Sequence, residues 1–162
     1  MNYFLISEIV FLQCFDVVLT LFPFKLKDIL PFKMNGLKYS EITSGIIRAS
    51  MNVHNTLGCG FQELIYQRAL AIEMQRANIP HAREVSIPIS YRGEIIGERR
   101  VDFLVENKIS VEIKALVQLE PVHIAQAKNY IEAFDLDVGL LINFGSHTLE
   151  FRRLERWDKK FN

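Results

Sequence analysis

The hydrophobic and polar positions follow a helical period over residues 40–78 of the chain. Apolar residues recur every three or four positions, which is the spacing of one helix face. This pattern predicts a helix over Ser40–Leu57, with Ser40 as its N-cap, and a second helix from Phe61 to about Asn78. Between them, Gly58-Cys59-Gly60 indicates a tight turn.

The pattern then changes to strands. The runs Val85–Arg92 and Ile95–Glu106 are joined at Gly93, which predicts a β-hairpin, and Ser110–Leu116 predicts a third strand. Because successive side chains on a strand point to opposite faces, each of these runs presents two different surfaces.

The last third of the chain adds one helix and two strands. Pro121 suits the first position of a helix that runs to about Phe134. Val138–Asn143 is almost wholly apolar, as in a strand covered on both faces, and Thr148–Leu154 predicts a final strand. The order of elements therefore predicts an α/β fold with a mixed central β-sheet flanked by helices.

The N-terminal segment has a different character. Tyr3–Phe24 is rich in large apolar residues, but Glu8, Gln13 and Asp16 interrupt it. A membrane-spanning helix needs roughly 20 mostly apolar residues, and an acid near its middle costs about 2.5–3.5 kcal/mol. We expect residues 1–36 to be a hydrophobic extension, loosely attached or upstream of a true start at Met34, outside a domain at 37–162. A membrane anchor is the alternative, although we expect no stable membrane association.

Composition limits the classes of function. The chain has 162 residues, which suits one domain with a substantial core. Its 19 basic and 19 acidic residues balance, so there is no overall positive field, although a local basic groove is compatible with this balance. Two cysteines are too few for a structural zinc site or a disulfide framework, and they favour a cytoplasmic setting.

Three charged residues in the predicted strands are the main candidates for chemistry. Asp102 lies in an apolar strand, and on the next strand Glu112 and Lys114 are two residues apart, so they share a face. Charged groups at strand centres are costly to bury without partners. A hard divalent cation bound by both carboxylates, with Lys114 beside the reacting group, would provide the partner. The alternative is a salt-bridged or solvent-facing strand edge.

Four motifs in order carry a family resemblance. They are G-x-x-E-x-x-Y at Gly60–Tyr66, the acid Asp102, E-x-K at Glu112–Lys114 and Q-x-x-x-Y at Gln126–Tyr130. Together they resemble the PD-(D/E)XK nuclease superfamily, and specifically the bacterial group named for its GxxExxY motif, which is related to RecB-type nuclease domains. The resemblance covers Tyr39–Leu154. One departure is Val101, which stands where the superfamily name has proline.

The resemblance implies a restriction-endonuclease-like α/β/α core and a metal site. By this resemblance Asp102 and Glu112 bind the ion, the carbonyl of Ile113 is a third ligand, and Glu63 helps to hold this ion or a second one. Oxygen ligands favour Mg²⁺ or Mn²⁺ over zinc. Lys114 would lie against the scissile phosphate and help the attacking water. For Glu63 the alternative is a solvated carboxylate on a helix surface.

The resemblance also implies a substrate-binding face on the later helix. His123, Gln126 and Tyr130 follow one another at helical spacing, and in RecB-like domains this face borders the active site and contacts the nucleic acid. The alternatives are that His123 only begins the helix and that Tyr130 only packs at the edge of the core. Tyr66 of the first motif is expected to pack in the core.

These observations predict a metal-dependent nuclease that hydrolyses phosphodiester bonds, with DNA as the expected nucleic acid. A non-catalytic module that binds nucleic acid or another partner on a nuclease-like fold is the main alternative, because fold does not determine function. An enzyme acting on a different phosphate ester is a third.

Overall fold

A computed structural model describes residues 36–156 of the chain. The hydrophobic extension predicted for residues 1–36 lies, apart from Gly36, outside the described residues, so its character stays a prediction. Within the described residues no helix is both long enough and apolar enough to cross a membrane.

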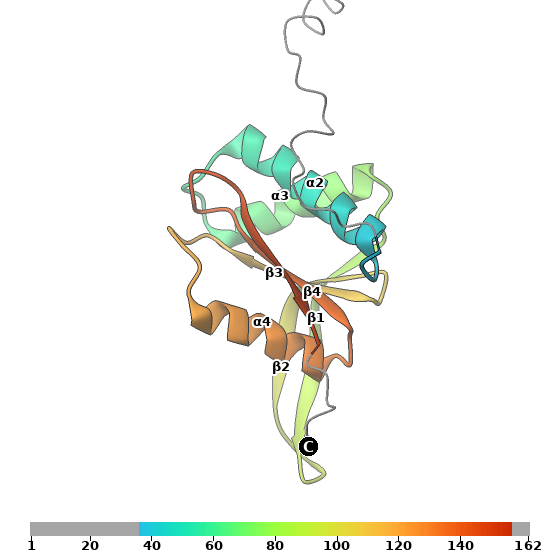
Figure 1. The fold of residues 1–162 in the computed structure, drawn as a ribbon. Coiled ribbons are helices and arrows are strands. Elements are labelled where there is room, and N and C mark those ends of the chain that lie inside the picture. Colours follow the sequence, from blue (N-terminus) through green and yellow to red (C-terminus); the bar gives the residue numbers. More distant parts are fainter. Residues whose placement is uncertain (1–35, 157–162) are drawn as a thin grey trace, which may run out of the picture. The chain divides into compact units, whose positions relative to one another are not determined.

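The order of helices and strands agrees with the prediction from the sequence (Figure 1). Two helices are followed by three strands, a helix and two strands. The elements are α2 (Ser40–Leu57), α3 (Glu63–Arg76), β1 (His81–Tyr91), β2 (Glu94–Val105), β3 (Ile109–Lys114), α4 (Pro121–Ala133), β4 (Val138–Asn143) and β5 (Glu150–Glu155).

The strands form one mixed five-stranded sheet in the order β1-β2-β3-β4-β5. Neighbours are antiparallel except β3 and β4, which are parallel. A parallel pair needs a crossover connection, and α4 provides it. Helices α2 and α3 cover one face of the sheet and α4 covers the other (Figure 1). The prediction of an α/β fold with a mixed sheet between helices is confirmed, and it is consistent with a restriction-endonuclease-like core.

Helix α3 begins at Glu63 rather than Phe61, and β5 begins at Glu150 rather than Thr148. Two further local predictions differ from the structure. Ser40 is not the N-cap of α2 but its first helical residue, and Tyr39 precedes it in a left-handed conformation with φ of 58° and no side-chain cap. The hydroxyl of Thr43 donates to the carbonyl oxygens of Tyr39 and Ser40, so it does not act as the cap. Strand β1 begins at His81 rather than Val85, because its first residues are mostly exposed and their polarity conceals the strand pattern.

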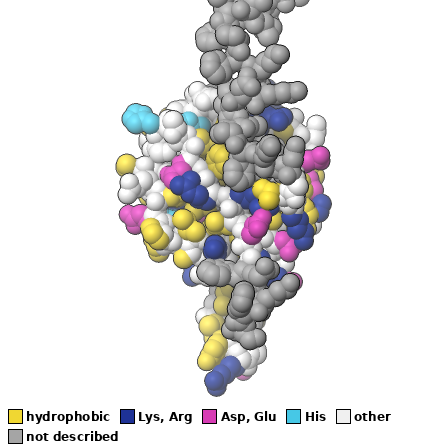
Figure 2. Space-filling view, in the orientation of Figure 1, with side chains coloured by type: hydrophobic (Ala, Val, Ile, Leu, Met, Phe, Trp, Pro, Cys, Tyr) yellow, Lys and Arg dark blue, Asp and Glu magenta, His cyan; other side chains and the backbone are white. Residues whose placement is uncertain are grey.

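The β1–β2 hairpin is confirmed at Gly93. Arg92 and Gly93 both have positive φ, of 51° and 89°, as a two-residue type I′ turn requires. The distal part of the hairpin pairs only within itself, because β2 pairs with β3 only over Phe103–Val105. The hairpin therefore extends beyond the sheet, with hydrophobic side chains along it and basic ones at its tip (Figures 1 and 2). Its exposed large hydrophobic residues are Tyr91, Ile95 and Ile96.

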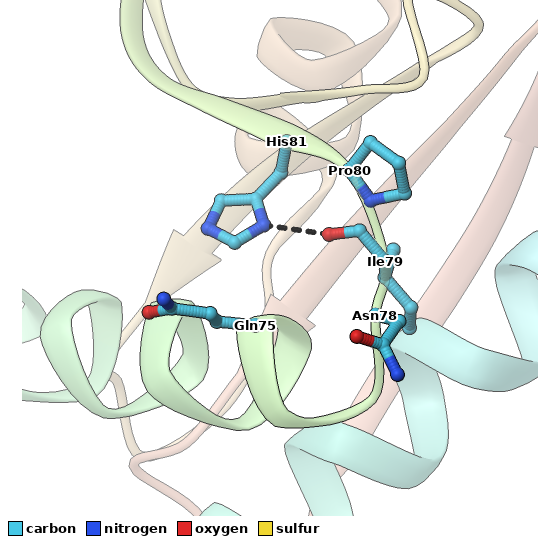
Figure 3. Close-up of a pocket in the computed structure, with 5 residues that line it drawn as sticks. All are labelled: Gln75, Asn78, Ile79, Pro80 and His81. Carbon is cyan, nitrogen blue, oxygen red and sulfur yellow. Dashed lines mark hydrogen bonds between the residues drawn. The ribbon is translucent and has the colours of Figure 1, made fainter.

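A shallow pocket of about 510 Å³ lies where α3 connects to β1 (Figure 3). The Nδ1–H of His81 donates to the carbonyl oxygen of Ile79 at 2.9 Å, and the His81 ring meets the edge of Phe103. No acid or lysine of the predicted site lines this pocket; its lining residues are Gln75, Asn78, Ile79, Pro80 and His81. We therefore assign His81 a structural role: its hydrogen bond to Ile79 stabilises the connection between α3 and β1.

We expect Gly145→Ala to destabilise the fold. A Cβ at Gly145 would overlap the backbone of Ala115 and Leu116, directly after the strand that carries Lys114. Urea unfolding should show a loss of roughly 1–3 kcal/mol, the usual cost of overpacking. The matched control is Gly97→Ala, where a Cβ meets nothing within 4 Å. Equal unfolding free energies for the two variants would contradict this prediction.

Candidate active site

The sheet forks where the predicted acids lie. The ladder between β2 and β3 ends at the pair Phe103 and Val111, but β3 continues beside β4 as far as Lys114. The last residues of β3 therefore have ladder partners on β4 and none on β2. This geometry opens a space between two neighbouring strands at the level of the charged residues.

The side chain of Asp102 occupies the fork. Its Oδ2 accepts the backbone N–H of Ile113 at 2.7 Å, in place of a bond between the strands. Continuing the β2–β3 register by one residue sets Asp102 opposite Glu112. The structure thus shows the amide of Ile113 as a partner of Asp102, and the metal-binding role of the Ile113 carbonyl stays a prediction.

Glu112 and Lys114 form a buried ion pair. Lys114 Nζ donates to Glu112 Oε1 at 2.7 Å, which confirms that the two side chains share a face. Only 8% of the Glu112 side chain and 12% of the Lys114 side chain are exposed. The strand edge is therefore salt-bridged but not solvent-facing. The second oxygen of Glu112, Oε2, is buried with no hydrogen-bond partner among the described residues.

Burial and like charge make the site favour an added positive charge. Burial and the charge of Asp102 raise the pKa of Glu112 to about 7, although Lys114 acts to lower it. Burial also raises the pKa of Asp102, while the Ile113 N–H and Lys114 act to lower it. Burial acts to lower the pKa of Lys114, but the ion pair with Glu112 and the nearby acids raise it overall. Lys114 is therefore charged near neutral pH.

Glu63 is close enough to act on the site electrostatically. It is the first residue of α3 and is exposed, and its charge raises the pKa of both Glu112 and Lys114. Tyr66, three residues later, is fully buried, as expected. Its hydroxyl donates to the Gly58 carbonyl at 2.9 Å and accepts the Phe61 N–H at 3.1 Å. Tyr66 thus holds the turn that leads into Glu63.

The three predicted substrate-binding residues lie on α4. His123 Nδ1 accepts the N–H of Glu120 at 3.0 Å, so it caps the start of the helix. Gln126 Nε2 donates to the hydroxyl of Tyr130 at 3.2 Å, and Tyr130 is 5% exposed. Within residues 36–156 no hydrogen bond joins these three to the charged residues of the fork. Their contact with nucleic acid stays a prediction.

The donor set at the fork fits a divalent ion only in part. In the described part of the chain, no group of three or more His, Cys, Asp or Glu side chains is close enough to hold a metal ion. The predicted set has two carboxylates, from Asp102 and Glu112, and one backbone carbonyl. A buried carboxylate oxygen without a partner calls for an explanation such as an ion, and Glu112 Oε2 is such an atom. The oxygen chemistry therefore suits Mg²⁺ or Mn²⁺.

Two residues that hold the site were not predicted from the sequence. Gln67 Nε2 donates to Asp102 Oδ1 at 3.0 Å. Asn143, fully buried at the end of β4, bonds the N–H and the carbonyl of Leu116, each at 2.9 Å. Signals for both exist in the sequence: Gln67 is four residues after Glu63 on one helix face, and Asn143 ends an apolar run.

A comparison with family models decides the broader relationship. The model of the PD-(D/E)XK nuclease superfamily matches residues 40–154. The chain belongs to this superfamily. The assignment of Asp102, Glu112 and Lys114 to the D, the E and the K of the superfamily motif, with Val101 in place of proline, stays a prediction. Membership of the GxxExxY group stays a prediction.

Comparisons with curated proteins and with solved structures give no further information about function. No curated protein matches the chain. A solved structure titled "Crystal structure of SSO0001" is similar, with a TM-score of 0.48 and 16% identity over 74% of this PD-(D/E)XK chain. The match spans 61% of that protein's chain.

The raised pKa of Glu112 predicts a pH dependence of stability without metal. Unfolded glutamate releases its proton near its ordinary pKa of 4.5, but folded Glu112 keeps it to about 7. Between these values the folded state binds more protons, so stability falls as pH rises. In EDTA, wild-type protein should lose more unfolding free energy than Glu112→Gln between about pH 5 and about pH 8, by up to about 3 kcal/mol. The control, Glu94→Gln at the exposed start of β2, should follow wild type. Parallel pH profiles of stability for wild type and Glu112→Gln would refute a raised pKa at Glu112.

Proposed function

We propose that this domain is a metal-dependent nuclease that hydrolyses phosphodiester bonds in DNA. One observation carries the proposal: at the fork, buried Glu112 has an unpartnered oxygen, lies opposite Asp102 and is paired with Lys114. Superfamily membership supports a nuclease activity. A module that only binds a partner has no chemical need to bury two carboxylates beside a lysine, because such groups are costly to desolvate.

The proposed metal ligands are Asp102, Glu112 and the carbonyl of Ile113, with Glu63 near the ion. Three carboxylates against one ammonium leave an excess of negative charge, which a divalent cation would balance. When bound, Mg²⁺ or Mn²⁺ supplies Lewis-acid stabilisation and makes water a better nucleophile at neutral pH. Glu112 Oε2 is the natural ligand atom, because Lys114 already occupies Oε1.

Lys114 is proposed to contact the scissile phosphate. An ammonium group has three N–H donors, and the bond to Glu112 uses one of them. The remaining donors suit phosphate oxygens, where negative charge accumulates in the transition state. In a mostly buried position such a fixed charge acts more strongly than in water. Glu112 holds the amine in place and, by favouring its charged form, keeps it ready for this role.

The proposed DNA contacts are local rather than global. The balanced charge of the chain gives no general attraction for phosphate, so affinity must come from the site and its border. We propose that His123, Gln126 and Tyr130 on α4 form part of that border.

We also propose that the protein is cytoplasmic and has no stable membrane association.

The first test is a cleavage panel. Single- and double-stranded DNA and RNA are incubated with wild-type protein and Mg²⁺, Mn²⁺ or EDTA. We expect ion-dependent cleavage of DNA, and a loss of at least about 100-fold in Lys114→Met, since one electrostatic donor to a transition state is worth about that much. The control Lys108→Met removes a half-exposed lysine on a turn. Ion-independent cleavage, or full activity in Lys114→Met, would contradict the proposal.

The second test measures metal binding through stability. An ion that binds only the folded state should stabilise it by about 2.7 kcal/mol at one hundred times its dissociation constant. Wild-type melting temperature should therefore rise with Mn²⁺, and Asp102→Asn should abolish the rise because it removes one carboxylate ligand. Asp135→Asn, an exposed acid paired with Arg156, should keep the rise. A wild type that responds to neither ion in melting nor cleavage would favour the binding-module alternative.

A further inference from the structure

Two donors from different elements hold the two oxygens of Asp102. Oδ2 accepts from the Ile113 N–H on β3 at 2.7 Å, and Oδ1 accepts from Gln67 Nε2 on α3 at 3.0 Å. Gln67 is only 4% exposed, so its amide is not competing with bulk water for this contact. Asp102 is thus oriented from both sides of its carboxylate.

Arg83 determines which way the Gln67 amide points. An amide can be turned by 180° with little change of shape, which would exchange its donor and acceptor ends. Arg83 Nη2 donates to Gln67 Oε1 at 2.7 Å, and an arginine can only donate. The Gln67 oxygen must therefore face Arg83, and the NH₂ group must face Asp102. The exposed arginine on β1 in this way directs a buried amide at the fork.

Ladder pairing between the strands does not fix the position of Asp102. The β1–β2 register passes from Arg83 opposite Phe103 to Val85 opposite Val101, and skips Glu84, whose φ is 52°. On the other side, the β2–β3 ladder stops at Phe103. The described ladders therefore contain no backbone pair for Asp102, although the two registers set Glu84 and Glu112 opposite it. Its carboxylate depends on the Ile113 amide and on Gln67.

We infer that Gln67 is a positioning residue for Asp102, with Arg83 holding Gln67, and that the pair presents the carboxylate to the divalent ion. This inference rests on the proposed function. A neutral amide suits the task, because it fixes the carboxylate without placing a full positive charge beside it to compete with the ion. The positive charge of Arg83 does not touch Asp102, because Gln67 lies between them in this chain of hydrogen bonds. Partners that orient a ligand in this manner commonly change metal affinity by 10–100-fold when they are removed.

The test separates positioning from general stability. Gln67→Met keeps the length of the side chain and removes both hydrogen bonds. The Mn²⁺ concentration that gives half of the melting-temperature rise should increase about tenfold. Cleavage at low Mn²⁺ should fall through kcat, with KM for DNA unchanged, and should recover at saturating Mn²⁺. The matched control is Gln75→Met, an exposed glutamine on the same helix.

Arg83 provides an independent variant at an exposed position. Arg83→Met should raise the half-maximal Mn²⁺ concentration in the same direction by a smaller factor, and Arg83→Lys should restore part of the affinity. If Gln67→Met and Arg83→Met both lower the metal-free melting temperature but keep the wild-type Mn²⁺ midpoint, the residues are only structural and the inference is overturned. If wild type itself shows no ion response and no cleavage, the proposed function fails as well, and the two failures are distinguishable.

Discussion

The hydrogen bond from the Ile113 amide to the Asp102 carboxylate is the interaction on which the site depends. A sheet that splits leaves backbone N–H groups without ladder partners, and a buried N–H without a partner is costly. Asp102 Oδ2 accepts that N–H at 2.7 Å, so the fork can exist without an orphaned amide. The same bond keeps a carboxylate at the level of Glu112. One hydrogen bond thus both gives the Ile113 N–H a partner and fixes the position of the Asp102 carboxylate.

The remaining architecture keeps the charged residues in place against their own repulsion. On one side of the fork, buried Tyr66 stacks on Phe144 with ring centroids 4.7 Å apart and ties the start of α3 to the sheet. On the other side, Asn143 and the close approach of Gly145 hold the chain that leaves β3 after Lys114. The fold therefore stabilises, through packing and neutral hydrogen bonds, an arrangement of charges that is unfavourable by itself.

Periodicity predicted most of the fold, and motif order predicted the charged residues of the site. The order of elements was right because each run is long and strongly periodic, and the shared face of Glu112 and Lys114 follows from strand alternation alone. The fork, Gln67 and Arg83 were not predictable in this way, because they depend on which strands and helices meet in space. The cap at Ser40 was wrong because Tyr39 enters the helix in a left-handed conformation, which no local pattern announced.

The hairpin has a mechanical consequence for the site. Strand β2 runs from its turn at Glu94 to Asp102, a length of roughly 27 Å at about 3.4 Å per residue, with one shift of the β1–β2 register at Ile96. Beyond the fork it is supported mainly by β1. The hairpin is therefore connected directly to the site, because the same strand that forms its outer part carries the Asp102 carboxylate near its inner end. The hydrogen bonds from the Ile113 amide and from Gln67, which Arg83 holds, are the contacts that would oppose a displacement of Asp102 by movement of the hairpin.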